Sequence, residues 1–588
     1  MRKIFSGVIS AVMATTIIFG LTGCLGKPVN PGSNAEGKKE IFVSLYDGGY
    51  GTDWFTPVKE EFEKDYPDYY VSVEKKKRTV AQIEQLIALG QQADMYVSTV
   101  SDFHTLIYSD KLEDISDVLD MKVDGETRTI GEKILDKELW KTIGSKDGKG
   151  LYMLPFEDGI TGFNYDHQKF VEYGLMIEAS ADDVTRAALT EQGIEYTETA
   201  GKLIFKRSAS ETNYNEGDVI LRAGKDGKFG TYDDGQPITM SEWNQMFLLL
   251  KGLGKAVIYP GKILDYTTDI FNGVFAQYDG LDNWKLFNTY DGAYTFDGDS
   301  APTKITMQNG YEVFGMTGIR KATEFMQTYL NNRDYAHESA FMSEESNTDA
   351  QGKFVVGSAK NSVDAPFTGL MVEGIWWEKE AKPAFDGLTE DPRYSDYKYG
   401  TRDYRIMLYP QMDGQKGADG NGNGSVLATR AAGSCIVTKN DDADILEKTK
   451  ILLAYTMKDE YLRYFTKTTG VVRAFDYELT SEDKASMTKY ARNVWELYRD
   501  GENVKFVRPL LDRYLTALPY KTSKGYNVNW YSKVDDVSYN MPISALRAAE
   551  KSLDKNVSSD PVGSAFKGFK AHFGGMWQQY INELKLKK

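Results

Sequence analysis

The feature that most constrains the fold is the alternation of short apolar runs with helical patterns after residue 40. Residues 41–46 read Ile-Phe-Val-Ser-Leu-Tyr and stop at the polar residues 47–49, as in a strand buried on both faces of a parallel sheet. Phe55, Val58 and Phe62 then recur at helical spacing with charges between them, which predicts a helix packed on that strand.

The alternation continues along the chain. Tyr66-Pro67-Asp68 ends this helix, and a second strand is predicted around Val71 and Val73. Thr79 is suited to cap the next helix, and residues 93–97 read as a third strand. Strands that alternate with helices predict an α/β fold with a parallel sheet and right-handed crossovers.

Charge and cysteine content narrow the class of protein. The chain has 588 residues and a formal net charge of −16, which argues against nucleic acid or anionic lipid as a partner and favours a neutral or cationic ligand. The only cysteines are Cys24 and Cys435. A chain of this length predicts two to four domain-sized units, and it can be held together by its core without disulfides.

The first residues have the layout of a bacterial secretion signal. Arg2 and Lys3 precede an apolar stretch over residues 4–21, which ends in Leu-Thr-Gly-Cys at Cys24. That ending resembles the bacterial lipobox, which implies a signal peptide over residues 1–23 and a lipidated Cys24. Residues 24–39 are rich in Gly, Pro, Asn and Ser, as in a flexible tether. We therefore expect an extracytoplasmic protein anchored by lipid to the cell membrane.

Seven short phrases follow one another between residues 40 and 475. They are Leu112-Glu113-Asp114-Ile115, Tyr152-Met153-Leu154-Pro155, Gly162-Phe163-Asn164-Tyr165-Asp166, Pro237-Ile238-Thr239-Met240-Ser241-Glu242-Trp243, Met371-Val372-Glu373-Gly374-Ile375-Trp376, Leu408-Tyr409-Pro410 and Gly433-Ser434-Cys435-Ile436-Val437. In this order they resemble the extracellular solute-binding proteins (family 1 type) that feed sugar ABC transporters.

The resemblance implies a two-lobe fold of the periplasmic-binding-protein type (type II), with a cleft, a hinge and discontinuous lobes enlarged by insertions. Ligand would be held in the cleft and the closed form recognised by the permease subunits. We expect a carbohydrate ligand, an oligosaccharide in particular, and a monomer. The expected lobes are residues 40–157 with 410–470 and residues 158–409 with 471–588, and the second lobe carries an insertion over residues 176–236.

The insertion contains an acidic, glycine-rich loop over residues 224–235. Asp226, Asp233 and Asp234 supply carboxylates, with backbone carbonyls such as that of Lys228 for the remaining positions, and Glu242 is placed to close the shell. Hard oxygen ligands of this kind suit Ca²⁺, and the loop resembles calcium-binding loops of extracellular proteins. The alternative is a solvated turn that caps the following helix. If the loop binds Ca²⁺, we expect the site to be structural.

The family resemblance also implies positions for the ligand contacts, because sugar sites combine aromatic rings with paired polar groups. They are Asp47, Tyr50 and Trp54 in the first loop, Asp94 beside the third strand, Glu157 and Asp158 at the first crossing, Glu373, Trp376 and Trp377 at a strand-to-helix turn, and Arg473. One of the two adjacent tryptophans is expected to stack on ligand while the other packs inside. Trp284 is either a lid residue over the cleft or a surface residue of a loop, and we expect it at the surface.

Catalysis is the main alternative to binding. Two carboxylates suffice for glycoside hydrolysis, so acidic residues alone do not exclude a glycan-degrading enzyme. However, the four histidines show no metal-binding spacing, and there is no serine-hydrolase or phosphate-loop motif. The sequence therefore favours a non-catalytic binding protein, and an adhesin or sensory receptor is the third possibility.

Overall fold

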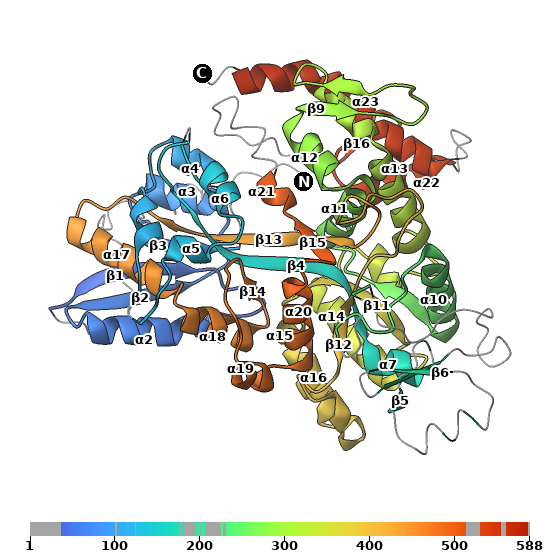
Figure 1. Ribbon diagram of the computed structural model, residues 1–588, viewed down its shortest axis with the longest axis horizontal. Coiled ribbons are helices and arrows are strands. Elements are labelled where there is room, and N and C mark those ends of the chain that lie inside the picture. Colours follow the sequence, from blue (N-terminus) through green and yellow to red (C-terminus); the bar gives the residue numbers. More distant parts are fainter. Residues whose placement is uncertain are drawn as a thin grey trace, which may run out of the picture.

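One mixed, ten-stranded sheet runs through two lobes of the protein (Figure 1). The computed structural model describes residues 37–99, 103–123, 125–146, 148–173, 231–512, 530–553 and 560–585, together with short pieces between 175 and 226. The main strand order is β2-β1-β3-β13-β4-β11-β8. We call the part built on β1, β2 and β3 the first lobe, and the part built on β8, β11 and β12 the second lobe.

The first lobe contains the predicted strand-helix-strand units. Strand β1 (Lys39–Leu45) is parallel to β2 (Tyr69–Lys75) and to β3 (Met95–Ser98). The predicted cap is present, since the Thr79 side chain accepts a hydrogen bond from the backbone of Gln82. The α/β prediction is thus confirmed. The helices of this lobe are α2 (Thr56–Asp65), α3 (Val80–Ala88), α4 (His104–Tyr108), α5 (Ile130–Lys133), α6 (Lys137–Ile143), α17 (Ala443–Tyr455) and α18 (Asp459–Thr469).

Two long strands pass from one lobe to the other (Figure 1). Strands β4 (Leu154–Asp166) and β13 (Ser425–Val437) are antiparallel neighbours, and the short strand β14 (Val472–Arg473) joins β4 at the crossing. Strand β13 pairs with β3 at one end and with β15 (Val504–Val507) at the other. Because these strands belong to both lobes, the residue boundaries expected for the lobes stay a prediction.

The second lobe extends the sheet beyond β4. Strand β11 (Thr368–Gly374) pairs antiparallel with β4 and parallel with β8 (Lys255–Ile258), and β12 (Tyr404–Met407) also pairs with β4. Helix α11 (Asp265–Asp279) is almost entirely buried. The other helices are α7 (His167–Glu172), α10 (Met240–Leu253), α13 (Thr317–Phe325), α14 (Asn347–Lys360), α15 (Trp377–Glu380), α16 (Lys382–Thr389), α20 (Lys489–Arg499) and α21 (Pro509–Asp512). Helix α19 (Ser481–Ser486) packs against α18 of the first lobe.

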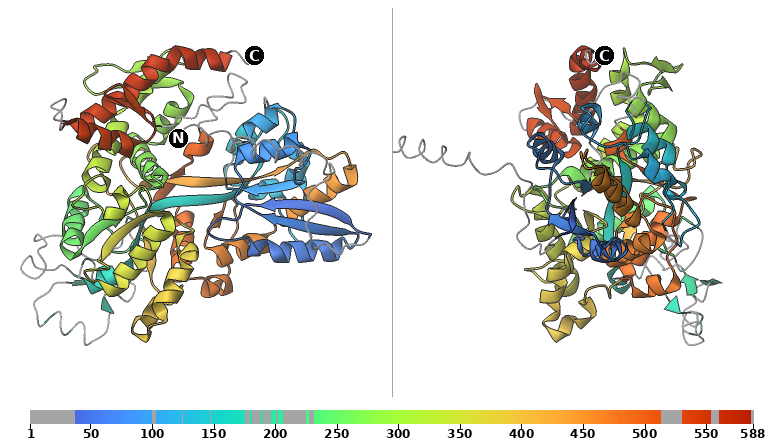
Figure 2. Two further views of the ribbon diagram at one scale, coloured as in Figure 1. Left: turned by 180° about the vertical axis from the view of Figure 1, so that it is seen from behind. Right: turned by 90° about the vertical axis from the view of Figure 1, so that its left-hand side faces the viewer.

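The C-terminal residues enlarge the second lobe around a cluster of rings. Helices α22 (Pro542–Leu553) and α23 (Pro561–Lys585), with strands β16 (Ser532–Val534) and β17 (Val537–Tyr539), gather beside α12 (Leu281–Thr289), β9 (Gly292–Tyr294) and β10 (Thr303–Ile305), as Figure 2 shows. The Phe314 and Phe573 rings stack with centroids 3.8 Å apart. The expectation that Trp284 lies at the surface is wrong. Its side chain is 5% exposed and its Nε1 donates to Asp512 Oδ2 at 2.7 Å, because its ring packs against those of Phe275 and Phe287, with centroids 5.5 Å and 6.1 Å away.

The predicted insertion is described only in part. Strands β5 (Ala179–Ser180), β7 (Lys202–Phe205) and β6 (Tyr196–Thr199) form a small antiparallel sheet. Cys24 and the whole signal segment lie outside the described residues. Across the described ranges, no helix combines the length and apolar character needed to span a bilayer.

Candidate functional site

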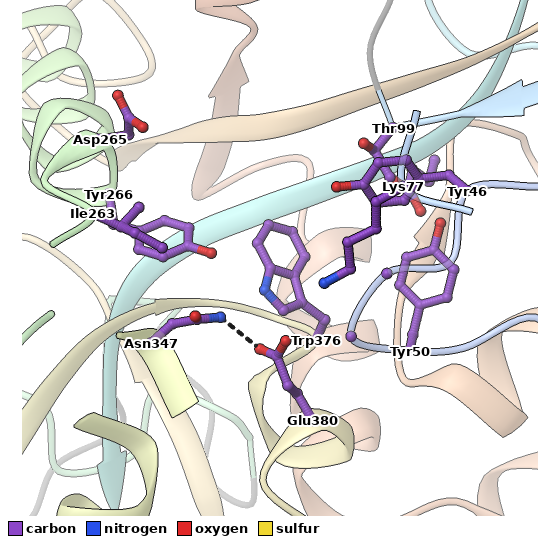
Figure 3. A pocket seen from close by; sticks show the side chains of 13 residues that line it. Tyr46, Tyr50, Lys77, Thr99, Ile263, Asp265, Tyr266, Asn347, Trp376 and Glu380 are labelled. Atoms are coloured by element: carbon purple, nitrogen blue, oxygen red, sulfur yellow. Dashed lines mark hydrogen bonds between the residues drawn. The ribbon is translucent and has the colours of Figure 1, made fainter. Parts of the chain in front are cut away.

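A cavity of about 450 Å³ lies between the two lobes, beside the crossing strands (Figure 3). Both lobes line it, and β4 contributes one residue at the crossing. This volume falls in the range of roughly 300–1,000 Å³ that is usual for small-molecule sites. The lining residues are Tyr46, Gly48, Gly49, Tyr50, Lys77, Thr99, Glu157, Ile263, Asp265, Tyr266, Asn347, Trp376 and Glu380.

The first lobe lines the cavity with residues that follow its strands. The loop after β1 carries Tyr46, Gly48, Gly49 and Tyr50, and Lys77 and Thr99 follow β2 and β3. In Figure 3 the Lys77 side chain extends from this wall toward Trp376. The position agrees with the rule that ligands bind at the carboxyl ends of parallel strands.

The second lobe contributes two aromatic rings. Trp376 lies just after β11, and Tyr266 is near the start of α11. Their ring centroids are 6.2 Å apart. Gly374 makes room for the Trp376 ring, since a Cβ at this glycine would lie 2.3 Å from a ring atom. The two rings therefore form a fixed apolar surface on this wall of the cavity.

A carboxylate is held beside these rings. Glu380 Oε2 accepts hydrogen bonds from Asn347 Nδ2 at 2.9 Å and from Gln351 Nε2 at 2.8 Å (Figure 3 shows the first). Both amides belong to α14. Because two donors fix one oxygen, the carboxylate has a defined orientation at the rim of the cavity.

Glu157 is the cavity residue that β4 contributes, and its side chain is fully buried. Among the described residues, neither of its carboxyl oxygens has a hydrogen-bond partner. Burial raises the pKa of Glu157 to about 8, although the nearby Tyr50 hydroxyl and Arg473 guanidinium act in the opposite direction. A buried polar group without a partner is costly, so this carboxyl is suited to a ligand that supplies the missing hydrogen bond.

The two adjacent tryptophans have different environments. Trp377 is fully buried, and its Nε1 donates to Asn164 Oδ1 at 3.1 Å, whereas Trp376 lines the cavity. Glu373 lies behind this wall, where burial raises its pKa to about 8 and its Oε1 accepts from the backbone N–H of Gly374 at 2.9 Å. Of this group, only Trp376 lines the cavity.

Three of the predicted contact residues line the cavity, namely Tyr50, Glu157 and Trp376. Asp47 is exposed beside this loop and does not line it. Trp54 is 4% exposed and packs against Phe156, with centroids 5.1 Å apart. Trp54 therefore belongs to the core of the first lobe.

Three further predicted residues have partners within the protein. Asp94, just before β3, accepts from the backbone N–H of Phe42 at 2.8 Å. Asp158 accepts from Arg508 Nη2 at 2.7 Å. The Arg473 guanidinium lies 3.9 Å from the Phe156 ring centroid, and its Nε donates to the Phe156 carbonyl. These three residues are not part of the cavity lining. Their expected contact with ligand therefore stays a prediction, and the geometry does not support it.

The acidic loop does not assemble a set of metal ligands in the described part of the chain. Asp233 Oδ2 accepts from the backbone N–H groups of Lys225 at 2.6 Å and of Asp226 at 3.2 Å. Glu242 Oε2 accepts from the backbone of Thr239 in a capping box. Among the described residues, no group of three or more His, Cys, Asp or Glu side chains converges on one point.

Part of this loop is not covered by the structure. Lys228 lies outside the described residues. Asp226, Asp233 and Asp234 lie close in sequence, and burial, with a smaller contribution from the nearby charge on Asp226, raises the pKa of Asp233 to about 6. The calcium site stays a prediction.

Sequence reasoning missed several residues that line the cavity, including Lys77, Tyr266, Asn347 and Glu380. Lys77 follows a predicted strand, so the rule that ligands bind at the carboxyl ends of parallel strands could have identified it. Tyr266 and Asn347 lie at the starts of helices, and none of the family phrases includes them. Only the packing of α11 and α14 on the sheet brings them to the cleft.

Two lobes joined by crossing strands, with a cavity that both of them line, define the class of two-lobe binding proteins. Comparison of the sequence with family models agrees with this class. The chain belongs to the bacterial extracellular solute-binding protein family, whose model matches residues 58–489. The predicted family and the predicted two-lobe fold are thus confirmed.

Solved structures show the same fold at low sequence identity. A chitin oligosaccharide binding protein is 11% identical with a TM-score of 0.50, and the match covers 92% of this chain and 98% of that one. A protein studied for xylan utilization by the thermophilic bacterium Caldanaerobius polysaccharolyticus is 10% identical with a TM-score of 0.51, and the match covers 92% of this chain and 100% of that one. The search of curated proteins found no match.

Proposed function

We propose that this protein captures a neutral carbohydrate, an oligosaccharide in particular, between its lobes and delivers it to the permease subunits of an ABC importer. The observation that carries the proposal is the cavity between the lobes, where the rings of Tyr266 and Trp376 adjoin the carboxyls of Glu157 and Glu380. Sugar rings present apolar faces edged by hydroxyls, which this combination suits. Similar folds in proteins named for chitin oligosaccharides and for xylan utilization support the same class of ligand.

The charge of the cavity favours an uncharged ligand. Its described lining contains the acidic groups of Asp265 and Glu380 and one cation, Lys77, whereas the Glu157 carboxyl, whose pKa burial raises to about 8, is mostly protonated at pH 7. An acidic sugar would place its carboxylate in this negative environment, which costs free energy because like charges repel at short range. Hydroxyl groups can donate to carboxylates without that cost.

A thermal-shift screen of mono- and oligosaccharides, with and without Ca²⁺, tests the ligand and the metal together. We expect a neutral oligosaccharide to raise the melting temperature. Trp376→Ala should reduce the affinity by at least tenfold, because the apolar face of the sugar loses its stacking partner. Tyr394→Ala is the matched control, since Tyr394 is outside the cavity lining. If Trp376→Ala binds as tightly as the wild type, the cavity is not the sugar site.

Release of reducing sugar separates binding from catalysis. The family is one of binding proteins, and we propose that this chain has no enzymatic activity. Incubation with glycans should release no reducing ends while the melting temperature still rises. An adhesin or sensory receptor would instead show no importer-dependent uptake of the sugar that it binds.

The membrane anchor and the calcium loop belong to this proposal as well. The lipobox resemblance at Cys24 supports a lipid-anchored receptor held beside its permease, and we propose that this receptor acts as a monomer. The acidic loop around Asp233 supports a structural Ca²⁺ that raises stability without entering the cleft. In that case Ca²⁺ should shift the melting temperature equally with and without sugar.

A further inference from the structure

Helix α15 touches the first lobe at two places, although it belongs to the second lobe. The Glu380 side chain lies against Gly49, in the loop after β1. Lys379 Nζ donates to the backbone carbonyl of Thr468 at 3.0 Å, at the end of α18. Glu380 lines the cavity, whereas Lys379 does not. These contacts join the lobes beside the ligand site.

The first contact depends on the absence of a side chain at Gly49. A Cβ placed there would lie 3.0 Å from Glu380 Cδ and 3.2 Å from Glu380 Cβ. Those distances are tighter than ordinary carbon contacts. Glu380 has little freedom to move aside, because Asn347 and Gln351 both donate to its Oε2. The glycine therefore lets the second lobe come this close.

The second contact joins a cation to a helix end. Thr468 is in the last turn of α18, where carbonyl groups carry the partial negative charge of the helix dipole. Lys379 reaches this carbonyl from the other lobe, and its ammonium group has no ion pair with any described residue that would compete for it. A charged donor on a helix C-terminus is a favourable arrangement.

We propose that Lys379 and Gly49 are positioning residues that hold the lobes closed around the ligand, Lys379 by its bond to Thr468 and Gly49 by admitting Glu380. The closing contacts themselves do not depend on the proposed function, but their expected effect on ligand affinity does. A ligand that contacts both lobes binds the closed form, so its apparent affinity falls in proportion to the closed fraction. Loss of one charged hydrogen bond that is partly exposed to water should lower the ratio of closed to open forms about three- to tenfold.

The experiment measures lobe separation directly, without a ligand. Leu89 in the first lobe and Leu248 in the second are 53% and 55% exposed, so Leu89→Cys and Leu248→Cys give spin-label sites in a full chain that carries Cys24→Ser. Cys435 is buried. Electron–electron distance measurements then compare the wild-type background, Lys379→Met and Lys382→Met. Lys382→Met is the matched control, since Lys382 pairs with Asp386 of its own helix α16.

We expect the wild-type background to populate the interlobe distance of this structure, and Lys379→Met to shift the distribution toward longer distances. Lys382→Met should leave it unchanged. Gly49→Ala tests the other contact and should shift the distribution in the same direction as Lys379→Met. Gly252→Ala, where an added Cβ would meet nothing within 4 Å, is its control.

The inference is overturned if the wild-type background never populates that distance, or if Lys379→Met and Gly49→Ala give the same distribution as their controls. The two proposals fail separately. A wild-type protein that closes but binds no sugar contradicts the proposed carbohydrate ligand and leaves the closing contacts standing. A wild-type protein that binds a sugar from the screen, with Lys379→Met binding it equally well, contradicts the closing contacts alone.

Discussion

At the scale of single residues, Glu157 couples the cavity to pH. Its folded-state pKa of about 8 lies above the ordinary value of 4.5. For an acid with a raised pKa, the stabilising contribution is fully present below the unfolded pKa and is lost as pH rises through the folded pKa. The free energy of unfolding should therefore decrease between about pH 5 and pH 8, by up to about 1.4 kcal/mol per pH unit from this group.

Glu157→Gln isolates that contribution. The amide resembles the protonated carboxyl in shape but does not ionise, so the variant should lose stability less steeply than the wild type between about pH 5 and pH 8. Denaturant unfolding at several pH values measures both slopes. Glu373 and Glu378 also have pKa values raised by burial, to about 8 and about 7, so only the difference between the two proteins reports on Glu157. Equal slopes would show that Glu157 does not titrate in this range.

The cavity also shows how adjacent residues divide their roles. Trp376 and Trp377 have the same side chain, so the sequence predicted one ring at the ligand and one in the core without saying which. The answer depends on Gly374, which makes room for the Trp376 ring, and on Asn164, which accepts from Trp377. Gly374 is only two residues from Trp376, whereas Asn164 lies on β4, more than 200 residues away, and the sequence around the tryptophans does not reveal it.

At the scale of elements, a buried ion network ties the crossing strand to both lobes. Asp158 on β4 accepts from Arg508 Nε at 3.0 Å and Nη2 at 2.7 Å, and from the Tyr498 hydroxyl at 2.8 Å. Arg508 follows β15, and its Nη1 donates to Asp136 Oδ2, beside α6 of the first lobe. The network joins elements that are more than 300 residues apart in sequence.

Asp158→Asn should destabilise the protein by about 3 kcal/mol, because it leaves the buried Arg508 without its principal counterion. Asp117→Asn is the control, since Asp117 is 57% exposed in its pair with Lys450 and such surface pairs contribute about 0–1 kcal/mol. Chemical denaturation compares the two. A loss below about 1 kcal/mol for Asp158→Asn would mean that water replaces the carboxylate at little cost.

The start of helix α10 shows where a rule for helix caps predicts more accurately than the prediction of a metal ligand. Glu242 was assigned to a metal shell from its acidity and its place after the loop. The structure uses it in a capping box with Thr239, a pattern that the spacing Thr-x-x-Glu before an apolar helix indicates by itself. Thr79 followed the same rule and was predicted correctly.

At the scale of the whole molecule, the lipid anchor proposed at Cys24 determines where the receptor works. Two acyl chains hold a protein on a membrane stably, whereas one gives only weak, reversible binding. Cys24→Ser should therefore move most of the protein from the membrane fraction to the soluble fraction while sugar affinity stays the same.

Cell fractionation followed by immunoblotting measures this distribution. Cys435→Ala is the control, because Cys435 is buried in β13 and has no access to lipid-modifying enzymes. If Cys24→Ser remains in the membrane fraction, another part of the protein is responsible for membrane attachment.

The sequence by itself determined the strands and helices of the first lobe, the cap at Thr79, the family and the class of fold, because periodicity, capping and ordered phrases are local properties of the chain. Only the tertiary structure decided which residues meet in the cleft. Tyr50, Glu157, Tyr266, Trp376 and Glu380 come from separate segments, and their meeting depends on how α11, α14 and α15 pack across the crossing strands. Burial likewise removed Trp54 and Trp377 from the cavity, since the free energy of packing a large ring depends on distant neighbours that no short stretch of sequence specifies.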